Sequence, residues 1–385
     1  MYKIMLPKYN QKKTIMIIAG EASGDHHGAK LVNAMKMEKN NLFFYGIGGN
    51  AMKKEGVKIL VDAAELAVVG ITEVFAKLPT IFKAFSVAKR LLKSLKLDLL
   101  ILIDYPDFNL RIAAAAKKLR IPVLYYISPQ IWAWRQGRVK KIGKIIDHMA
   151  VILPFEEIFY KKHGIPVTFV GHPLLDSSID SSRSSSEIKK SGQQIIGLLP
   201  GSRNSEITKL LPVMLETAVL LQKKFDDIKF ILSIAPTVDK QYIKKTVRNF
   251  NSIINLELND GPVINVLEQS CFVITASGTV TLETGISGTP MIIVYKISPV
   301  SFMLGKLMIK VENIGLVNLI AGKTLVPELI QNEASPQNIA ATAGRILDDP
   351  LLMENIRNEL LKIKNILGGP GASLEVAKIA LNMLS

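Results

Sequence analysis

Asp104 occupies a position from which a carboxylate can do chemistry. It directly follows the predicted strand Leu97–Ile103, and parallel α/β sheets bind their ligands at the carboxyl ends of strands. Partial burial there raises the proton affinity of a carboxylate, as a general base requires. Pro106 separates Asp104 from the following helix, so a capping role does not suit it. We predict that Asp104 is a catalytic base, and Asp107 remains open between a second acid in the site and a helix cap.

A glycine-bracketed turn, Gly20–Asp25, follows the first predicted strand, Thr14–Ala19. Such a turn brings backbone N–H groups and a helix N-terminus to the same edge of the sheet, where they favour an anion. Acidic residues in this turn of an otherwise basic chain indicate contact with a polar substrate. The residues predicted to line a substrate site here are Glu21, Ser23, Gly24 and Asp25. For Ser23, a cap of the following helix fits the pattern equally well.

Both tryptophans of the chain lie in one short stretch after another predicted strand, Pro122–Ile127. Trp132 and Trp134 can pack against a sugar ring or an acyl chain, and the adjacent Arg135 can bind phosphate. We predict that these three residues contact the substrate. The alternative is that the two indoles fill a surface between domains.

Two turns with small residues lie in the second half of the chain, each after an apolar strand. The first ends in Arg203, whose planar guanidinium suits a diphosphate. The second, which contains Ser277, Gly278 and Thr279, precedes a predicted helix, and its backbone N–H groups can bind an anion. Glu283 lies one helical turn further, where a carboxylate can accept hydrogen bonds from ribose hydroxyls, although a solvated surface position is the alternative. The predicted nucleotide-binding residues are Gly201, Ser202, Arg203, Ser277, Gly278, Thr279 and Glu283.

The predicted elements alternate between strands and helices, which indicates parallel sheets covered by helices. A Ser-, Lys- and Arg-rich stretch at 177–192 has almost no apolar residues and divides the pattern in two. We predict two Rossmann-like domains that face a cleft, residues 1–176 and 193–371, joined by this linker. The terminal helix, within residues 372–385, is expected to pack back on the first domain.

The remaining predicted strands are Leu42–Tyr45, His148–Leu153, Ile195–Leu199, Lys229–Ile234, Cys271–Thr275 and Pro290–Val294. The other predicted helices are Gly24–Lys36, Ile81–Leu95, Asn109–Leu119, Val139–Ile145, Pro336–Leu347 and Met353–Leu361.

The chain has 385 residues and a formal net charge of +15, from 48 Lys and Arg against 33 Asp and Glu. Such a field attracts anions, so nucleic acid, phosphorylated substrates and an acidic membrane surface are all compatible with it. We expect no nucleic-acid partner, because the basic residues are dispersed and no RNA-binding aromatic pattern is present. The single cysteine, Cys271, excludes an intramolecular disulfide and fits a reducing cytoplasm. Neither a signal peptide nor a membrane-spanning run is predicted.

Together these residues resemble the lipid-A-disaccharide synthases over nearly the whole chain. The resemblance is carried by AGEASGD, IDYPDFN, YISPQIWAWR, LPGSRNSEI and ASGTVTLE, with LAVVGITEV, LPFEEIFY, VGHPLLD and NLIAG in support. That family is similar to the GT-B glycosyltransferases, in which two Rossmann-like domains face each other across a cleft. The fold class that it implies is the α/β, two-domain arrangement predicted above.

The resemblance implies transfer of 2,3-diacylglucosamine from UDP-2,3-diacylglucosamine to the 6-hydroxyl of 2,3-diacylglucosamine 1-phosphate. The products would be a β-1,6 disaccharide 1-phosphate and UDP, with inversion at the anomeric carbon. Asp104 would accept the acceptor's proton, while Arg203 would stabilise the charge on departing UDP. By its place in the family pattern, Asn318 is expected near the nucleotide. No metal or other cofactor is expected, because no Asp-x-Asp pair follows a strand in the first half and the adjacent His26 and His27 are poor co-ligands.

The same resemblance accounts for the positive charge, because donor, acceptor and the inner-membrane surface are all anionic. We expect a cytoplasmic enzyme peripherally associated with the inner membrane of a Gram-negative-type bacterium. The segment Val68–Lys96 mixes apolar and basic residues and is a candidate for the bilayer interface; a core-packing helix with a solvated basic face is the alternative. The rival functions are another GT-B-group enzyme, such as a UDP-N-acetylglucosamine 2-epimerase or a peptidoglycan transferase, and a non-catalytic anionic-lipid-binding protein.

Overall fold

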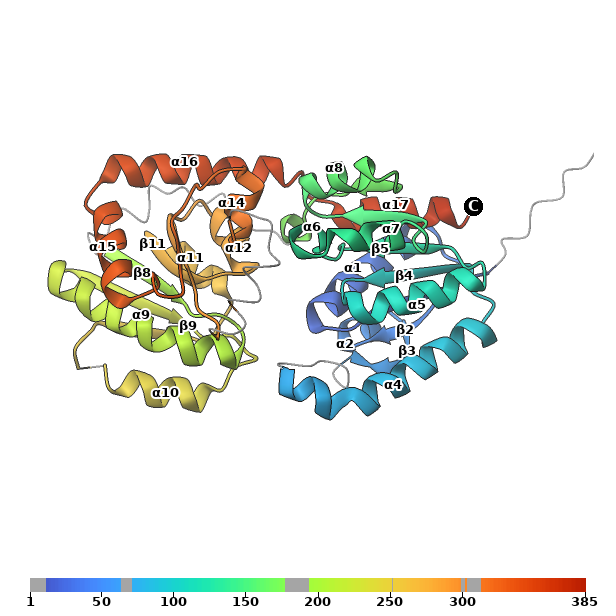
Figure 1. The fold of residues 1–385 in the computed structure, drawn as a ribbon, viewed down its shortest axis with the longest axis horizontal. Coiled ribbons are helices and arrows are strands. Elements are labelled where there is room, and N and C mark those ends of the chain that lie inside the picture. Colours follow the sequence, from blue (N-terminus) through green and yellow to red (C-terminus); the bar gives the residue numbers. More distant parts are fainter. Residues whose placement is uncertain (1–11, 64–70, 177–193, 251, 299–301, 303–312) are drawn as a thin grey trace, which may run out of the picture. The chain divides into compact units, whose positions relative to one another are not determined.

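The computed structural model describes residues 12–63, 71–176, 194–250, 252–298, 302 and 313–385, with the backbone alone for 71–79 and 81. The chain divides into two compact units, which we call unit 1 (Met1–Ser177 with Gly368–Ser385) and unit 2 (Ser178–Leu367). Each unit has its own parallel sheet with helices packed against it (Figure 1). The predicted linker, 177–192, lies outside the described residues.

The described part of unit 1 contains a seven-stranded parallel sheet in the order β3-β2-β1-β4-β5-β6-β7. Its strands are β1 (Lys13–Ala19), β2 (Leu42–Gly48), β3 (Lys58–Asp62), β4 (Leu99–Ile103), β5 (Val123–Tyr126), β6 (His148–Val151) and β7 (Val167–Phe169). The order reverses between β1 and β4, which pair directly, and such a switch point is where open α/β sheets bind ligands. The turn Gly20–Asp25 follows β1 and Asp104 follows β4, so the topology brings these two motifs together.

The helices of unit 1 cover both faces of this sheet and build a separate core on each. They are α1 (Ala22–Glu38), α2 (Asn50–Lys54), α4 (Ile71–Ser94), α5 (Pro106–Lys118), α6 (Ile131–Trp134), α7 (Val139–Ile142), α8 (Pro154–Lys162) and α17 (Ala372–Met383). One core contains buried residues of α4, α5, α7 and α8, and the other contains those of α1, α2 and α17. Because β4 is buried on both faces, its sequence is a continuous hydrophobic run.

The C-terminal helix α17 is part of unit 1 although it follows unit 2 in the chain. It packs against α1, and one carboxylate fastens its first turn. Asp176 accepts hydrogen bonds from the backbone N–H groups of Gly371, Ala372 and Ser373 at 2.7–3.1 Å and from the Ser373 hydroxyl at 2.9 Å. A carboxylate at a helix N-terminus satisfies donors that have no partner within the helix.

The described part of unit 2 contains a six-stranded parallel sheet in the order β10-β9-β8-β11-β12-β13. Its strands are β8 (Gln194–Leu199), β9 (Ile228–Ser233), β10 (Leu256–Asn259), β11 (Phe272–Ala276), β12 (Met291–Tyr295) and β13 (Glu328–Ile330). Its helices are α9 (Asn204–Lys224), α10 (Lys240–Arg248), α11 (Val263–Gln269), α12 (Val280–Ile286), α14 (Leu316–Ala321), α15 (Pro336–Leu347) and α16 (Pro350–Ile366). The order reverses between β8 and β11, and the two small-residue turns of the second half follow these two strands.

The predicted fold class is confirmed, and the differences lie in single elements. Helix α4 begins ten residues before its predicted start at Ile81, and α7 ends at Ile142 rather than Ile145. The short strands β3, β7, β10 and β13 were not predicted. In the described residues, no helix is both long and apolar enough to cross a membrane.

Candidate active site

The backbone at Asp104 adopts a conformation that is rare for residues other than glycine. Asp104 and Tyr105 both lie in the left-handed region, with φ of 46° and 48°. A non-glycine residue in this conformation destabilises the fold by of order 1–3 kcal/mol, and it persists only where contacts with the surrounding structure hold it there. The turn directs the chain sharply from β4 into α5, and it places Asp104 at the switch point.

Two buried side chains hold this turn through its carbonyl groups. The Tyr125 hydroxyl donates to the carbonyl oxygen of Asp104 at 2.6 Å. The Asn109 side-chain amide donates to the same oxygen at 2.6 Å and to the carbonyl oxygen of Ile103 at 3.1 Å. Both side chains are fully buried. Since neither was predicted as a site residue, the clamp on Asp104 is a feature that sequence reasoning missed, although Asn109 ends the IDYPDFN stretch.

The glycine turn after β1 packs directly against this strained turn. A Cβ at Gly20 would lie 2.3–2.8 Å from three carbons of the Tyr105 ring, so only glycine lets the ring occupy this position. The Glu21 carboxylate is exposed and close enough to act on the charge of Asp104. Burial, and secondly this neighbouring charge, raise the pKa of Asp104 to about 6. Asp104 therefore combines the location and the proton affinity of a general base at neutral pH.

The other residues predicted in the Gly20–Asp25 turn have different surroundings. Ser23 is exposed in the first turn of α1, and the N-cap position belongs to Glu21 without a side-chain cap. Gly24 is buried, where a Cβ would come within 3.3 Å of the Ala19 Cβ, so it allows α1 to approach β1.

Asp25 departs most clearly from its predicted contact with substrate. Its carboxylate is 6% exposed and accepts the backbone N–H groups of Gly49, Ala51 and Met52 at 2.6, 2.9 and 3.1 Å. These donors belong to the start of α2, so Asp25 anchors that helix to α1. The Asp25 carboxylate therefore has a structural role in joining α1 to α2, and its contact with substrate stays a prediction.

The tryptophan stretch divides into a buried and an exposed part. Trp132 is 7% exposed, packs against Phe155, and donates its indole N–H to Glu156 at 3.0 Å. This leaves its ring little surface to offer a ligand. Trp134 is 42% exposed, and the guanidinium of Arg135 lies 4.0 Å from the centre of its ring. The exposed Trp134, with the half-buried Arg135 on its ring, is thus the part of the stretch that can meet a substrate.

Glu156 organises the loops after β5 and β6 and was not predicted. It is 2% exposed and accepts hydrogen bonds from Ser128, Trp132 and the backbone N–H of Leu153. Burial raises its pKa to about 7 in spite of these donors. A buried carboxylate with several donors fixes the geometry of the loops that supply them.

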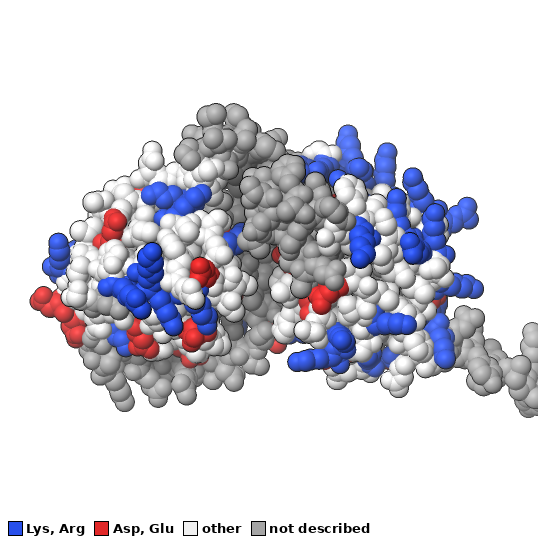
Figure 2. Space-filling view, turned by 90° about the horizontal axis from the view of Figure 1, so that it is seen from below, with Lys and Arg blue, Asp and Glu red and all other residues white. Residues whose placement is uncertain are grey.

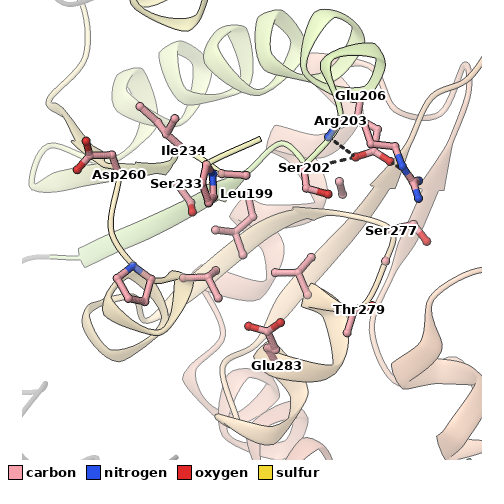
Figure 3. Close-up of a pocket in the computed structure, with 18 of the residues that line it drawn as sticks. Leu199, Ser202, Arg203, Glu206, Ser233, Ile234, Asp260, Ser277, Thr279 and Glu283 are labelled. Carbon is pink, nitrogen blue, oxygen red and sulfur yellow. Dashed lines mark hydrogen bonds and ion pairs between the residues drawn. The ribbon is translucent and has the colours of Figure 1, made fainter. Parts of the chain in front are cut away.

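Unit 2 contains a pocket of about 700 Å³ at the carboxyl ends of β8, β9, β10 and β11 (Figure 3). That volume lies in the range of small-molecule sites. Most of the predicted nucleotide residues line it: Gly201, Ser202, Arg203, Ser277, Gly278, Thr279 and Glu283. Sequence reasoning missed the lining segments 233–236 and 260–263, which follow β9 and β10.

The turn after β8 presents its donors around one carboxylate. Glu206 accepts the backbone N–H groups of Ser202 and Arg203 at 3.1 and 3.3 Å, and the Arg203 guanidinium at 3.2 Å. Gly201 has a φ of +111°, and a Cβ there would lie 2.4 Å from the Glu206 carboxylate. The Arg203 side chain is 68% exposed, so its remaining N–H donors are accessible from the pocket.

Glu283 projects from α12 into this pocket, across from Arg203 and Glu206 (Figure 3). Burial raises its pKa above the usual range of a glutamate. The solvated surface position considered for Glu283 therefore does not describe it. A half-buried carboxylate in a pocket is suited to accept hydrogen bonds from neighbouring hydroxyls.

Asn318 does not line the pocket, in contrast to its predicted place near the nucleotide. It is fully buried in α14, donates to Glu328 and to the Val326 carbonyl, and accepts the N–H groups of Leu325 and Val326. Glu328 in turn accepts the N–H groups of Ile314 and Gly315. Asn318 thus ties the 313–328 segment together, and its place near the nucleotide stays a prediction. In the part of the chain that the structure describes, no group of three or more His, Cys, Asp or Glu side chains is arranged to hold a metal ion.

Solved structures with the same two-unit architecture are glycosyltransferases and sugar-nucleotide enzymes. The UDP-GlcNAc 2-epimerase of Neisseria meningitidis, solved with UDP-GlcNAc, superimposes with a TM-score of 0.65 at 13% identity, covering 96% of this chain and 100% of that one. MurG of Acinetobacter baumannii superimposes with a TM-score of 0.60 at 14% identity, covering 96% and 99%. At these identities the likeness shows the fold alone, and that fold is the GT-B glycosyltransferase class.

The family is shown by sequence. The lipid-A-disaccharide synthetase family matches residues 15–366. Curated lipid-A-disaccharide synthases of Geobacter sulfurreducens and Nitrosococcus oceani are 47% identical over 380 residues and 41% identical over 379 residues, covering 97% of this chain and 98% and 97% of theirs. The chain belongs to the lipid-A-disaccharide synthase family and is a glycosyltransferase of lipid A biosynthesis. The epimerase and lipid-binding alternatives are thereby set aside.

Proposed function

We propose that Asp104 is the base with which this chain joins two acylated glucosamines, one carried by UDP and one bearing a 1-phosphate. The proposal depends on the position and the proton affinity of the Asp104 carboxylate. It stands at the switch point of unit 1, on a strained and clamped turn, with its pKa raised to about 6. At neutral pH it is ionised and still basic enough to take the proton of an attacking sugar hydroxyl.

In the proposed reaction, the 6-hydroxyl of the acceptor attacks the anomeric carbon of the donor as Asp104 removes its proton. The C1–O bond to UDP breaks, and the electron pair leaves with the diphosphate. A single displacement of this kind inverts the anomeric centre. The neighbouring Glu21 raises the proton affinity of Asp104, and its exposed carboxylate would accept a hydrogen bond from an acceptor hydroxyl.

The pocket of unit 2 is the proposed donor site. Arg203 and the N–H groups of the turns at Gly201 and Gly278 would stabilise negative charge on departing UDP. Glu283 would accept the ribose hydroxyls. The segments 233–236 and 260–263, on the other side of the pocket, are placed to enclose the base. A diphosphate competes with Glu206 for the turn's donors, so nucleotide binding is expected to displace that side chain.

Helix α4 is the proposed contact with the anionic membrane surface. Of its described residues, Phe82 is 59% exposed, and Lys83, Lys89, Arg90 and Lys93 are exposed beside it. Phe85, in contrast, packs on Phe108 in the core, so part of the apolar stripe serves the fold. Figure 2 shows that Lys and Arg far outnumber Asp and Glu on this face of unit 1, the right-hand unit. An exposed aromatic residue with basic neighbours suits a peripheral interface.

Part of the predicted membrane segment lies outside the described side chains. Residues 68–70 lie outside the described part, and no side chain is described at 71–79 or 81. They include Val69, Ile71, Val74, Phe75, Lys77, Leu78 and Ile81.

The function is tested by measuring UDP release with both substrates present and with each omitted in turn. We expect release only when UDP-2,3-diacylglucosamine and 2,3-diacylglucosamine 1-phosphate are combined. Release from the donor alone would indicate hydrolysis, and conversion of the donor into an isomer would indicate epimerisation; either result refutes the proposal. For the membrane contact, sedimentation with anionic vesicles at low salt should carry the protein down, and full retention in the supernatant would refute it.

A further inference from the structure

A second groove of about 360 Å³ lies in unit 1 between α5 and the helical turns that include α7. It is lined by one face of each: Asp107, Leu110, Arg111 and Ala114 on α5, and Arg138, Lys141, Ile142 and Ile145 on the other side. Both sets follow the spacing i, i+3, i+4, i+7, which places their members on a single helical face. None of these residues has a part in the function described so far.

Two ion pairs show that the segments flanking the groove run side by side in the same direction. Asp107, in the first turn of α5, pairs with Arg138 at 3.1 Å. Lys117, in the last turn of α5, pairs with Asp147, which precedes β6. Each segment crosses from the carboxyl end of one strand to the start of the next. The end of the groove with the Asp107–Arg138 pair therefore adjoins the catalytic edge, three residues from Asp104.

The charged residues of the groove are concentrated toward the end with the Asp107–Arg138 pair. Asp107 and Arg111 lie in the first half of α5, and Arg138 and Lys141 precede the apolar residues of the opposite segment. Three cations and one anion give this end a formal charge of +2. Leu110 and Ile142 line the groove beside these charges, and Ala114 and Ile145 form its apolar far end.

This polarity matches an amphiphile with an anionic head and a hydrocarbon tail. Arg and Lys bind phosphate oxygens through charge-assisted hydrogen bonds, and an apolar floor gains from each methylene group that it covers. In a 2,3-diacylated glucosamine 1-phosphate, the phosphate and the 2-acyl chain leave adjacent ring carbons. Both groups can therefore enter one groove while the 6-hydroxyl, on the far side of the ring, remains free to face Asp104.

We infer that this groove binds the 1-phosphate and the neighbouring acyl chain of the acceptor. The inference rests on the proposed function for the identity of the occupant. The cations hold the phosphate at the catalytic edge, and the chain lies between α5 and the turns of α7. The Asp107 carboxylate competes with the phosphate for Arg138, so it moderates binding.

The groove is tested first by binding, without reference to catalysis. The probe is dodecyl phosphate below its critical micelle concentration, measured by calorimetry, with inorganic phosphate and neutral dodecyl maltoside for comparison. Ala114→Leu fills the apolar floor, and Arg111→Gln removes one cation. Each should weaken dodecyl phosphate binding by about tenfold. Asp107→Asn should tighten it.

Matched controls separate the groove from general effects of charge and apolarity. Lys118→Gln removes an exposed cation of the same helix outside the groove, and Ala341→Leu adds the same side chain at an exposed position of α15. Both should bind dodecyl phosphate like the parent chain. Equal weakening by the controls, unchanged binding in both groove variants, or equally tight binding of dodecyl maltoside would overturn the inference.

Steady-state kinetics then identify the occupant. Arg111→Gln and Ala114→Leu should raise KM for the acceptor about tenfold while KM for the UDP donor and kcat at saturating acceptor stay unchanged. Weaker dodecyl phosphate binding with an unchanged acceptor KM would show that the groove takes another anionic lipid and would overturn the assignment. If the parent chain makes no disaccharide at all, the proposed function fails, and the binding experiment alone still decides whether an anionic lipid site exists.

Discussion

Replacing Asp104 with asparagine should lower turnover strongly and, at the same time, stabilise unit 1 at neutral pH. Folding raises the pKa of Asp104 from 3.8 to about 6, so the folded state binds this proton more tightly than the unfolded state does. Wild-type stability therefore falls as pH rises through this window. A shift of about 2 units, at about 1.36 kcal/mol per unit, amounts to about 3 kcal/mol above pH 6. Asparagine keeps the shape without the charge and avoids this cost.

The assay is urea unfolding between pH 5 and 8, followed by tryptophan fluorescence, since both tryptophans lie in unit 1. The stability difference between variant and wild type should be about half its full size at pH 5 and reach about 3 kcal/mol above pH 7. Turnover should fall by about 10²- to 10⁴-fold, the usual contribution of a general base. Asp226→Asn, at an exposed position of unit 2, is the control and should change neither quantity. A pH-independent stability difference, or unchanged turnover, would refute the reasoning.

Three further variants test other parts of the account. Tyr125→Phe removes a hydrogen bond to the Asp104 carbonyl and should lower kcat roughly five- to tenfold with little change in KM, whereas Tyr126→Phe, on the opposite face of the sheet, should not. Equal kcat values in the two variants would show that the hydrogen bond from Tyr125 to the Asp104 carbonyl does not support catalysis. Glu283→Gln should raise KM for the UDP donor about tenfold and leave KM for the acceptor unchanged; an effect on the acceptor alone would contradict its placement. Asp25→Ala should lower the free energy of unfolding by about 2–4 kcal/mol, and a neutral result would show that the α2 anchor is dispensable.

The switch-point motifs were predictable because their positions follow from local pattern and general topology. An apolar run followed by Asp104, and another followed by Gly201, each end at the carboxyl edge of a parallel sheet. Neither prediction depends on which residues are in contact in the folded protein. The same reasoning placed Glu283 correctly on the pocket wall, because one helical turn separates it from the cradle at Gly278.

The residues whose surroundings could not be predicted are those whose partners lie outside their own motifs. The Asp25 carboxylate accepts hydrogen bonds from the start of α2, 24 to 27 residues away. The sequence of the Gly20–Asp25 turn does not indicate those donors. Trp132 meets Glu156, 24 residues on, and is buried by that contact. Asn318 is held by Glu328 through a loop that sequence alone leaves unstructured.

The missed pocket segments have a different cause. Strand β10 is four residues long and only partly buried, so its sequence lacks the apolar run by which a strand is recognised. The segment 260–263, which follows β10, could therefore not be assigned to the carboxyl edge of the sheet. The segment 233–236 begins within the predicted strand Lys229–Ile234, and it has no charged or aromatic residue that would suggest a binding role. Enclosure by small and apolar groups becomes visible only when the strands are placed side by side.

The structure of the product tests the central claim most directly. Purified protein is incubated with both acylated substrates, and the product is examined by mass spectrometry and by NMR of its new anomeric proton, in parallel with Asp104→Asn. We expect a β-1,6-linked disaccharide 1-phosphate from the parent chain and at least about a hundredfold less from the variant in the same time. An α linkage, or the same disaccharide yield from the variant, would contradict direct attack by an acceptor hydroxyl that Asp104 deprotonates.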